Sequence, residues 1–416
     1  MTATRTAYTD SLRFFGSRAP LDLIAEFGSP LYVYNEDILR RSCREMRDLA
    51  RLPGFTASYS TKANANPHLL RIIREEGLHA DAMSPGELAV LRLAGFTREE
   101  IFYVCNNVSR EELAAAGKET ALVGVDSLDQ LEMFGEACPG GRVMVRINPG
   151  IGAGHHKKVI TAGHDTKFGV LPEEFPRMRS ILERHGLSLK GLNQHVGSLF
   201  LEPTPYLEAA ATLLALAEEF EGLEVLDFGG GFGIPYRKYE NAARLDLKAL
   251  GRALEDLVLP WVKKTGYAGR FITEPGRYVA AECSLVLGTV HAAKSNGSVR
   301  YVGTDLGFTI LARPMLYEAF HDLEVYPADA SPREIMRQTV AGNICESGDI
   351  LAGDRDIPEC RRGDIIAALD AGAYGHSMSS NYNMRLRPAE VLIGSDGNAR
   401  PIRRRDTVED LLRAYL

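Results

Sequence analysis

Between residues 56 and 273 the sequence alternates short β-type runs with longer helical stretches, and no other feature restricts the fold as strongly. Eight such runs stand at 56–60, 78–81, 101–104, 121–125, 143–147, 189–194, 224–227 and 270–273. The helices predicted between them include 85–94, 110–117, 128–137, 173–185, 205–220 and 247–264. Strands that alternate with helices pair in parallel through right-handed crossovers. Eight units in about 220 residues favour a closed (β/α)8 barrel of the TIM type over an open doubly wound sheet.

The pattern changes after Arg277. Strand-like runs at 283–292, 299–305, 338–341, 364–369 and 389–393 have few helical stretches between them. They predict a second, mostly β domain of sandwich or barrel-like form. Residues 1–29 have no partner in the barrel count, so we predict that they join this domain. The predicted division is a barrel over residues 30–280 and a β domain made of residues 1–29 and 281–416.

Two elements precede the barrel period. Residues 31–34 predict a short strand, and residues 36–49 have apolar positions at helical spacing. We assign both to a segment that flanks the barrel.

Composition excludes several classes of partner. Lysine and arginine number 48 against 55 acidic residues, a net charge of −7, and the basic residues are scattered along the chain. We therefore do not expect a nucleic-acid or anionic-membrane partner. We expect a small-molecule substrate. No apolar run is long enough for a membrane span and no secretory leader is recognisable, which predicts a cytoplasmic protein. The six cysteines are far apart without CxxC spacing, which predicts free thiols and no zinc site.

Polar and glycine-rich residues follow the predicted strands at the end where a barrel presents its active site. The set comprises Lys62, Asp81, Ser84, Asn106, Asn107, Asn148, His195 to Ser198, Gly229 to Gly231, and Glu274 to Arg277. Each residue alone is ordinary, but their shared placement predicts one site for a small molecule.

Two of these features are ambiguous when taken alone. Lys62 stands where the first strand stops, before a helix opened by Asn66 and Pro67, and is either a surface charge or a site residue. The glycine run 229–231 either makes a tight turn or lets backbone N–H groups cradle a phosphate. It is neither a Walker nor a Rossmann fingerprint.

Taken together, these residues match the needs of pyridoxal 5′-phosphate. Lys62 supplies the amine that binds the cofactor covalently, and the glycines hold its phosphate. The carboxylate of Glu274 keeps the pyridine nitrogen protonated, and the imidazole of His195 stacks on the ring. A protonated ring is an electron sink that stabilises the carbanion left when an amino acid loses carbon dioxide. The set therefore predicts a site for pyridoxal phosphate.

Seven segments in order resemble motifs of the fold-type III pyridoxal-phosphate decarboxylases, the alanine racemase-like barrel group, and within it the diaminopimelate decarboxylases. The segments are 59–64, 193–198, 228–233, 274–277, 313–317, 345–349 and 372–375, followed by Ser380 to Asn383. The resemblance implies loss of carbon dioxide from meso-2,6-diaminopimelate to give L-lysine, a step of lysine biosynthesis.

The resemblance also implies a set of cofactor contacts. They are Lys62, Asp81, His195, Ser198, Gly229, Gly230, Gly231, Glu274, Gly276, Arg277 and Tyr374, the last as a phosphate ligand. Lys62, His195 and Cys345 are the implied catalytic residues.

For the substrate, the resemblance implies that Arg277, Arg313 and Tyr317 hold the distal carboxylate. A guanidinium suits this role because its fork binds a carboxylate bidentately. Glu346 faces the distal ammonium group, and Tyr374 also contacts the substrate.

Cys345 resembles a thiol that reaches the cofactor face from a second subunit and protonates the substrate carbon. The implied assembly is a head-to-tail homodimer with two shared active sites.

Some positions depart from the family pattern, among them Leu199 and Thr61. Residues 152–169 resemble a loop that closes over the site in the diaminopimelate enzymes, although the histidines and lysines at 155–158 are additional. We interpret this loop as a lid that excludes water. No metal is expected at His155 and His156, because no acidic or cysteine partner stands at ligand spacing.

Other functions remain compatible with the sequence. One is decarboxylation of another basic amino acid, such as D-ornithine, D-lysine or carboxynorspermidine. A second is a non-catalytic barrel protein that binds the cofactor, and a third is a sugar-phosphate barrel enzyme without pyridoxal phosphate. The pair Arg277 and Arg313 favours diaminopimelate, since a substrate without a second carboxylate would not need it.

Overall fold

The computed structural model describes residues 7–148, 153–154, 167–240 and 242–416, which form two compact units. The barrel unit comprises the described residues of 40–234 and 244–279. The β unit comprises the described residues up to 39, those of 235–243, and residues 280–416. Residues 155–158 and most of the predicted lid lie outside the described residues.

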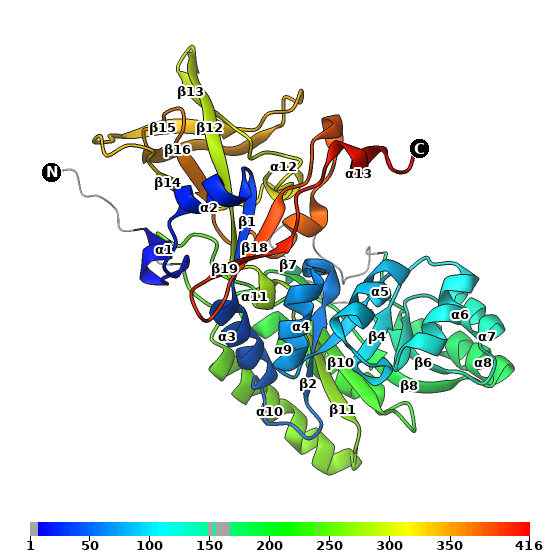
Figure 1. The fold of residues 1–416 in the computed structure, drawn as a ribbon. Coiled ribbons are helices and arrows are strands. Elements are labelled where there is room, and N and C mark those ends of the chain that lie inside the picture. Colours follow the sequence, from blue (N-terminus) through cyan, green and yellow to red (C-terminus); the bar gives the residue numbers. More distant parts are fainter. Residues whose placement is uncertain (1–6, 149–152, 155–166, 241) are drawn as a thin grey trace. The chain divides into compact units, whose positions relative to one another are not determined.

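In the described part of the barrel unit, eight parallel strands close into a barrel (Figure 1). They are β2 (Thr56–Ser60), β3 (His79–Ala82), β4 (Ile101–Val104), β5 (Leu122–Val125), β6 (Arg142–Arg146), β8 (Ser188–Asn193), β10 (Val225–Gly230) and β11 (Arg270–Glu274). Neighbours around the barrel follow the order of the chain, and β11 pairs with β2 to complete the circle. The predicted (β/α)8 barrel is confirmed, and all eight predicted strands form.

Helices separate these strands along the chain. They are α4 (Pro67–Glu75), α5 (Pro85–Ala94), α6 (Arg110–Glu119), α7 (Leu128–Ala137), α8 (Phe175–His185), α9 (Thr204–Ala217) and α10 (Leu247–Thr265), with the short α11 (Arg277–Ala280) after the last strand. The side chains of Ser84, Ser109 and Ser127 each accept a hydrogen bond from the N–H group three residues on. Such an N-cap contributes about 1 kcal/mol. The predicted starts of α5, α6 and α7 are therefore confirmed.

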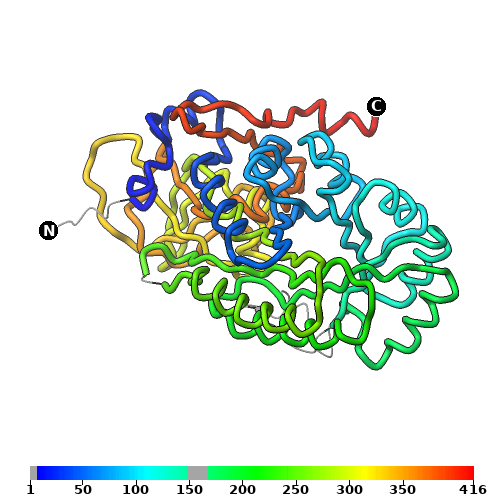
Figure 2. Tube along the Cα trace, turned by 90° about the horizontal axis from the view of Figure 1, so that it is seen from below, coloured from blue at the N-terminus to red at the C-terminus, as the bar shows by residue number. Residues whose placement is uncertain are grey.

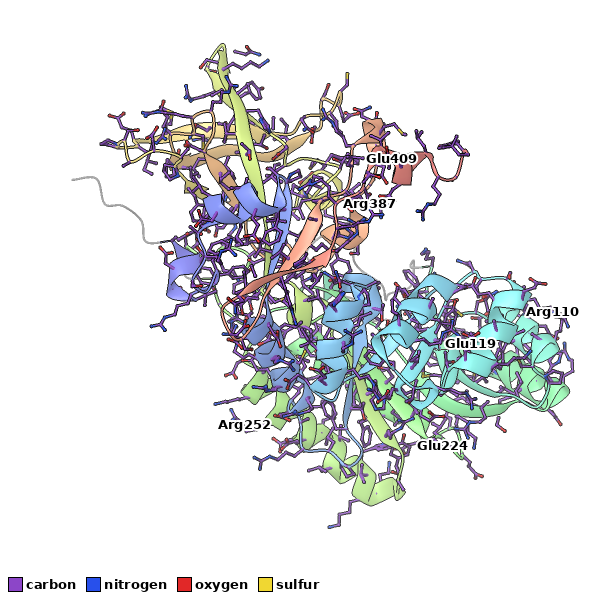
Figure 3. The ribbon with its side chains drawn as sticks, in the orientation of Figure 1. Arg110, Glu119, Glu224, Arg252, Arg387 and Glu409 are labelled. Atoms are coloured by element: carbon purple, nitrogen blue, oxygen red, sulfur yellow. The ribbon has the colours of Figure 1, made fainter. Side chains whose placement is uncertain are left out.

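An apolar cluster fills part of the barrel, and many charged side chains lie on its outer surface. Phe102, Leu122, Met144, Val225 and Ile272, from five different strands, form one buried cluster. Arg110 and Glu224 are exposed on the outer surface (Figure 3). A filled interior confines chemistry to the strand ends.

The β unit contains a sheet of nine strands among its described residues. They are β1 (Leu31–Asn35), β12 (Ser284–Asn296), β13 (Val299–Thr304), β14 (Leu323–Tyr326), β15 (Ile335–Ala341), β16 (Ile350–Pro358), β17 (Ile365–Ala368), β18 (Ala389–Ile393) and β19 (Ala399–Arg403). The predicted mostly β domain is confirmed. Strands β14, β16 and β19 were not predicted, because short or charged strands lack a clear apolar alternation.

Strand β1 lies in this sheet, where it pairs antiparallel with β12 and parallel with β18. In Figure 2 the blue N-terminal trace runs beside the red C-terminal trace of the same unit. All five residues of β1 are buried. From the sequence we assign residues 31–34 to a segment that flanks the barrel. The pairing of β1 with β12 and β18 corrects this assignment. An apolar strand that is buried on both faces lies in the interior of a sheet, with a neighbouring strand on each edge. The predicted boundaries at 30 and 280 stay a prediction.

Short helices complete the two units. They are α1 (Tyr8–Ser11), α2 (Pro20–Phe27), α3 (Glu36–Arg47), α12 (Arg313–Tyr317) and α13 (Val408–Leu412). The helix predicted at 36–49 forms over most of its predicted length.

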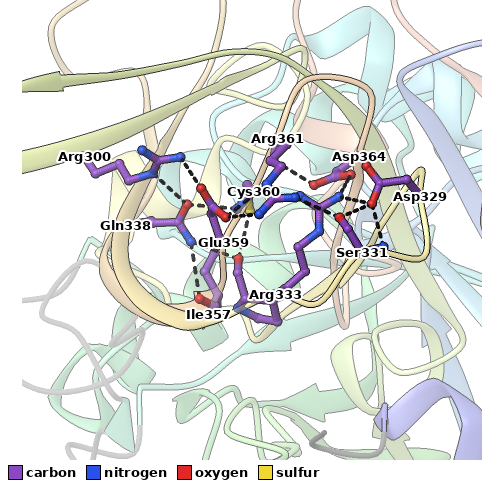
Figure 4. Close-up of polar contacts among 11 residues, drawn as sticks. Arg300, Asp329, Ser331, Arg333, Gln338, Ile357, Glu359, Cys360, Arg361 and Asp364 are labelled. Carbon is purple, nitrogen blue, oxygen red and sulfur yellow. Dashed lines mark hydrogen bonds and ion pairs between the residues drawn. The ribbon is translucent and has the colours of Figure 1, made fainter. Parts of the chain in front are cut away.

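A polar network closes the turn after β16 (Figure 4). The side chain of Asp364 is 1% exposed and accepts from Arg333 at 3.0 Å and from the N–H group of Arg361 at 2.7 Å. Glu359 pairs with both Arg361 and Arg300, at 2.6 and 3.2 Å. The buried charges in this turn are thus compensated, as buried charges must be.

Candidate active site

Lys62 lies on a tight turn that the local sequence shapes. Strand β2 ends at Ser60, and a single 3-10 turn over Thr61–Ala63 leads to Asn66, which caps α4 by accepting from the N–H group of His68. Pro67 then occupies the first helical position, where its missing N–H group costs nothing. The lysine is therefore presented at the carboxyl end of its strand.

A cavity of about 300 Å³ lies at these strand ends. Five of the predicted residues line it, namely Lys62, Asp81, Asn106, His195 and Glu274. They come from five different strand ends, so the barrel brings together residues up to 212 positions apart in the chain. The rest of the described lining includes Arg146, Lys167, Phe168 and Asn193.

The carboxyl groups in and behind the cavity have pKa values raised above those of the same groups in water. Burial raises the pKa of Asp81 well above its ordinary value, and the nearby Glu274 raises it further. Burial likewise raises the pKa of Glu274, helped by Asp227 behind it. The pKa of Asp227 rises to about 7, chiefly through burial, and the Asp227 and Glu274 carboxyls are hydrogen-bonded. Burial therefore favours the neutral form of these three carboxyl groups.

The ring of His195 is neutral in this environment. Burial lowers its pKa well below the ordinary value, and the charges of Lys62 and Arg146 lower it further. Its Nδ1 accepts a hydrogen bond from the N–H group of Gly230 at 3.2 Å. Glu274 lies 3.8 Å from the same nitrogen, but an atom that accepts from an amide carries no proton, so this contact is not an ion pair.

Positions 229 to 231 require glycine, both because a side chain would not fit there and because of the backbone conformation. A Cβ atom on Gly229 would lie 2.2 Å from the carbonyl oxygen of Gln194, and one on Gly230 only 1.9 Å from that of Glu274. Gly229 and Gly231 also have φ angles of +73° and +108°. This cradle admits close backbone approach, which a phosphate group requires.

Arg277 and Ser198 are brought together by hydrogen bonding. Arg277 is 7% exposed and donates to Oγ of Ser198 at 2.9 Å. Gly276 directly precedes Arg277, the first residue of α11. These three predicted residues thus lie at the ends of the same barrel.

The remaining predicted residues belong to the β unit. Arg313 and Tyr317 are the first and last residues of α12, and Arg313 is 2% exposed. Cys345 and Glu346 lie exposed between β15 and β16, and Tyr374 follows β17 with a φ angle of +58°. Their roles in the site stay a prediction.

Sequence reasoning missed Arg146 and gave no role to Asn193, the first residue of the segment 193–198. Both line the cavity, at the ends of β6 and β8. Burial lowers the pKa of Arg146, while Glu274 and Asp126 oppose this. A signal was present, because Arg146 is a charged residue that ends an otherwise apolar strand interior. Asn193 carries a buried Oδ1 atom without a hydrogen-bond partner among the described residues.

The donor set fits pyridoxal phosphate. The cavity combines the amine of Lys62, the neutral imidazole of His195 and the buried carboxyl groups of Asp81 and Glu274. The glycine segment 229–231 leaves no room for Cβ atoms beside the backbone. The buried Oδ1 atom of Asp81 has no hydrogen-bond partner in the described chain. No cluster of three histidine, cysteine or acidic side chains suited to a metal ion occurs among the described residues. In the same residues, no helix is long and apolar enough to cross a membrane.

Comparison with known proteins gives one consistent result. Residues 36–281 match the family model described as pyridoxal-dependent decarboxylase, pyridoxal binding domain. The chain is 39% identical over 409 residues to a diaminopimelate decarboxylase of Methanothermobacter thermautotrophicus, covering 96% of this chain and 94% of the relative. A crystal structure of diaminopimelate decarboxylase is similar with a TM-score of 0.86 and 31% identity, over 97% of this chain and 99% of that one. The diaminopimelate decarboxylase of Helicobacter pylori complexed with L-lysine has a TM-score of 0.86 at 29% identity, over 95% and 98% of the two chains.

Proposed function

The chain belongs to the pyridoxal-dependent decarboxylases, and on this premise we propose that it converts meso-2,6-diaminopimelate to L-lysine and carbon dioxide. The relatives that match nearly the whole chain carry this activity in their names, and one of them binds the product L-lysine. The observation that carries the proposal is the meeting of Lys62, His195 and Glu274 in one cavity at the strand ends.

Bound pyridoxal phosphate supplies the electron sink that accepts the electron pair left by departing carbon dioxide. Lys62 binds the cofactor covalently through its amine. Glu274 holds a proton on the ring nitrogen. Burial raises the pKa of the Glu274 carboxyl group, so this group is protonated in the folded chain and can supply that proton. His195, being neutral, packs against the ring without repelling a cationic cofactor.

The remaining cofactor contacts follow from the same placement. Gly229 to Gly231 allow the phosphate to approach the backbone, with Gly276 and Tyr374 as further contacts. Asp81 lines the cavity, and its Oδ2 accepts from Ser60 at 2.8 Å, while its buried Oδ1 has no hydrogen-bond partner among the described residues. Ser198 contacts the cofactor and orients Arg277 through their hydrogen bond.

Selection of the substrate is assigned to the residues that the resemblance implies. Arg277, Arg313 and Tyr317 bind the distal carboxylate, for which a guanidinium fork has the right geometry. Glu346 receives the distal ammonium group, and Tyr374 also contacts the substrate. A substrate with only one carboxylate would leave buried guanidinium donors unsatisfied, which disfavours D-lysine and D-ornithine.

We further propose a homodimer in which Cys345 of the partner subunit protonates the substrate carbon. Cys345 and Glu346 are exposed in the single chain, as residues that act on a partner's site must be. We also propose a cytoplasmic location, because all six cysteines are free thiols, a state typical of reducing compartments.

The test is a steady-state comparison of substrates with the PLP-loaded protein. We expect L-lysine to form from meso-2,6-diaminopimelate far faster than amines form from D-lysine, D-ornithine or carboxynorspermidine. Equal or faster turnover of the monoacids would assign another decarboxylase activity. A Lys62→Ala variant should lose the visible absorption of the bound cofactor. A wild-type protein that takes up no cofactor would exclude the enzyme.

A further inference from the structure

The loop between β15 and β16 carries two residues of the proposed chemistry, Cys345 and Glu346. Both are exposed, as are Ser347 and Gly348 after them. An exposed loop keeps one conformation only if its backbone is held, because ordering each residue costs entropy. The residue that ends the loop, Asp349, is only 4% exposed.

The carboxylate of Asp349 accepts hydrogen bonds from two separate segments. Oδ1 accepts from the N–H group of Phe308 at 2.6 Å, and Oδ2 accepts from that of Ile344 at 3.1 Å. The next N–H group, that of Cys345, donates to Oδ1 of Asn383 at 3.0 Å. Two consecutive N–H groups beside the thiol are thus held by side-chain acceptors.

Two glycines make room for the Asp349 carboxylate. A Cβ atom on Gly307 would lie 2.2 Å from Oδ1, and one on Gly342 would lie 2.3 Å from Oδ2. Neither glycine has a positive φ angle, so space and not backbone conformation requires them. The chain is therefore built around this carboxylate at two distant positions.

Backbone hydrogen bonds close the loop without help from that side chain. The N–H group of Gly342 donates to the carbonyl oxygen of Asp349 at 3.0 Å, and the N–H group of Asp349 donates to that of Glu346 at 3.1 Å. The carboxylate adds a connection that these bonds do not make, namely the one to Phe308.

The segment of Phe308 leads directly to substrate-binding residues of the proposed function. The carbonyl oxygen of Gly307 accepts from the N–H groups of Ile310 and Leu311, at 3.0 and 2.9 Å, in a turn that ends at α12. Helix α12 carries Arg313 and Tyr317. One carboxylate therefore ties the thiol loop to the start of the segment that presents the guanidinium group.

We propose that Asp349 is a positioning residue that holds the Cys345–Glu346 loop and the segment entering α12 in one arrangement. The inference rests on the proposed function, which assigns Cys345 and Arg313 their roles. Because the thiol must deliver a proton to one carbon atom, a displacement of about 1 Å is costly, roughly 100-fold in rate. Asp349 acts through this loop and needs no contact with substrate.

The test compares Asp349→Asn with Asp356→Asn in the PLP-loaded enzyme. Asparagine fits the same cage, but its NH2 group faces a backbone N–H donor, so one of the two hydrogen bonds is lost. Asp356 lies exposed on β16, and its substitution removes the same charge from a solvated position. Turnover of meso-2,6-diaminopimelate and the rate of Cys345 alkylation by iodoacetamide are measured for both variants.

For Asp349→Asn we expect kcat to fall by about tenfold or more, with a smaller change in KM, because the thiol is misplaced. The alkylation rate should change severalfold while the absorption of the bound cofactor is kept. Alkylation reports on this loop, since all six cysteines lie in described residues and, in the single chain, Cys345 is exposed while Cys138 is half-buried and the other four are buried. Asp356→Asn should match the wild type. An Asp349→Asn enzyme with wild-type kcat and alkylation rate, even with a lower melting temperature, would refute the positioning role.

A second variant decides the matter if Asp349→Asn does not fold. Asn383 is exposed and has a φ angle of +52°, which glycine adopts without strain. Asn383→Gly removes the other acceptor of the thiol loop, and the alkylation rate should again change severalfold. An unchanged rate would count against the proposal. Alkylation needs no substrate, so a wild type that makes no lysine would contradict the proposed function while leaving the positioning result readable.

Discussion

The Nε2 atom of His321 accepts a hydrogen bond from Nη1 of Arg313 at 2.8 Å, and each residue is 2% exposed. On the other side of the ring, Nδ1 contacts the carbonyl oxygen of Leu369 at 2.6 Å. A carbonyl oxygen only accepts, so the proton is on Nδ1 and Nε2 carries the lone pair. The ring of Tyr236 packs 4.6 Å from the guanidinium carbon. The orientation of Arg313 is therefore set from two sides.

Replacing His321 should weaken substrate binding without loss of cofactor. In His321→Leu a buried guanidinium donor loses its acceptor, which costs about 1.5–3 kcal/mol, or about 10- to 150-fold in kcat/KM. Most of the change should be in KM for meso-2,6-diaminopimelate. His291→Leu is the control, because the side chain of His291 is 60% exposed. Equal KM values in the two variants would contradict the link between His321 and Arg313.

Removing Arg313 itself should change selectivity. In Arg313→Ala the distal carboxylate loses a buried partner, at a cost of roughly 2 to 5 kcal/mol in transition-state binding. A monoacid such as D-lysine has no such carboxylate, so its kcat/KM should change little. The ratio of the two kcat/KM values measures the effect. A ratio equal to that of the wild type would argue against carboxylate binding by Arg313.

A methyl group on the glycine cradle should prevent cofactor binding. In Gly230→Ala the new Cβ atom would lie 1.9 Å from the carbonyl oxygen of Glu274, so β10 or β11 must shift. We expect the affinity for pyridoxal phosphate to fall at least about tenfold, because the cradle no longer admits close approach. Gly353→Ala is the matched control, since a Cβ atom there meets nothing within 4 Å. Absorption titration with the cofactor compares the two variants.

The stability of the cofactor-free protein should depend on pH through Asp227. Its pKa of about 7 in the folded chain lies above the ordinary 3.8, so between these pH values the folded chain keeps a proton that the unfolded chain releases. The free energy of unfolding should therefore fall as pH rises through this window, by up to about 4 kcal/mol. Asp227→Asn still accepts from Gly229 through Oδ1 and should flatten this dependence. Urea unfolding at the two ends of this pH range measures the change in the free energy of unfolding. An equal change in Asp227→Asn and the wild type would contradict the assignment of this pH dependence to Asp227.

The network at the turn after β16 should be sensitive to Arg333. In Arg333→Met the buried carboxylate of Asp364 loses its cationic partner, which should lower the free energy of unfolding by about 3–5 kcal/mol. Arg337→Met is the control, because Arg337 is exposed and lies 3.7 Å from the exposed Asp354. Such a surface pair contributes at most about 1 kcal/mol. Equal unfolding midpoints for the two variants would show that the network contributes no stability.

The barrel and part of its site were predictable because both depend on local patterns. Strand and helix periods are local, and parallel pairing orders the strands around the barrel. Lys62 lies two residues after the end of β2 and Glu274 is the last residue of β11, so their meeting in one cavity follows from the fold. Arg146 was missed because a single charged residue in a strand does not reveal whether it points inward.

The β unit was harder to predict for a physical reason. Strand β1 lies between β12 and β18, partners about 250 and 360 residues away in the chain. No local pattern specifies a partner at that distance, because such pairing depends on contacts between residues far apart in the sequence. The hydrogen bonds from Phe308 to Asp349 and between His321 and Leu369 have the same origin, because they join residues 41 and 48 positions apart in the sequence.

By itself the sequence determined the class of barrel, the order of its strands and the residue types at their ends, because these depend on local periodicity and on chain connectivity. Only the tertiary structure decided the protonation of the site, since the raised pKa of Glu274 and the neutral ring of His195 arise from burial and from neighbours on other strands. It also decided how Arg313 and the loop of Cys345 are held, because the contacts made by His321 and Asp349 exist only in the folded chain.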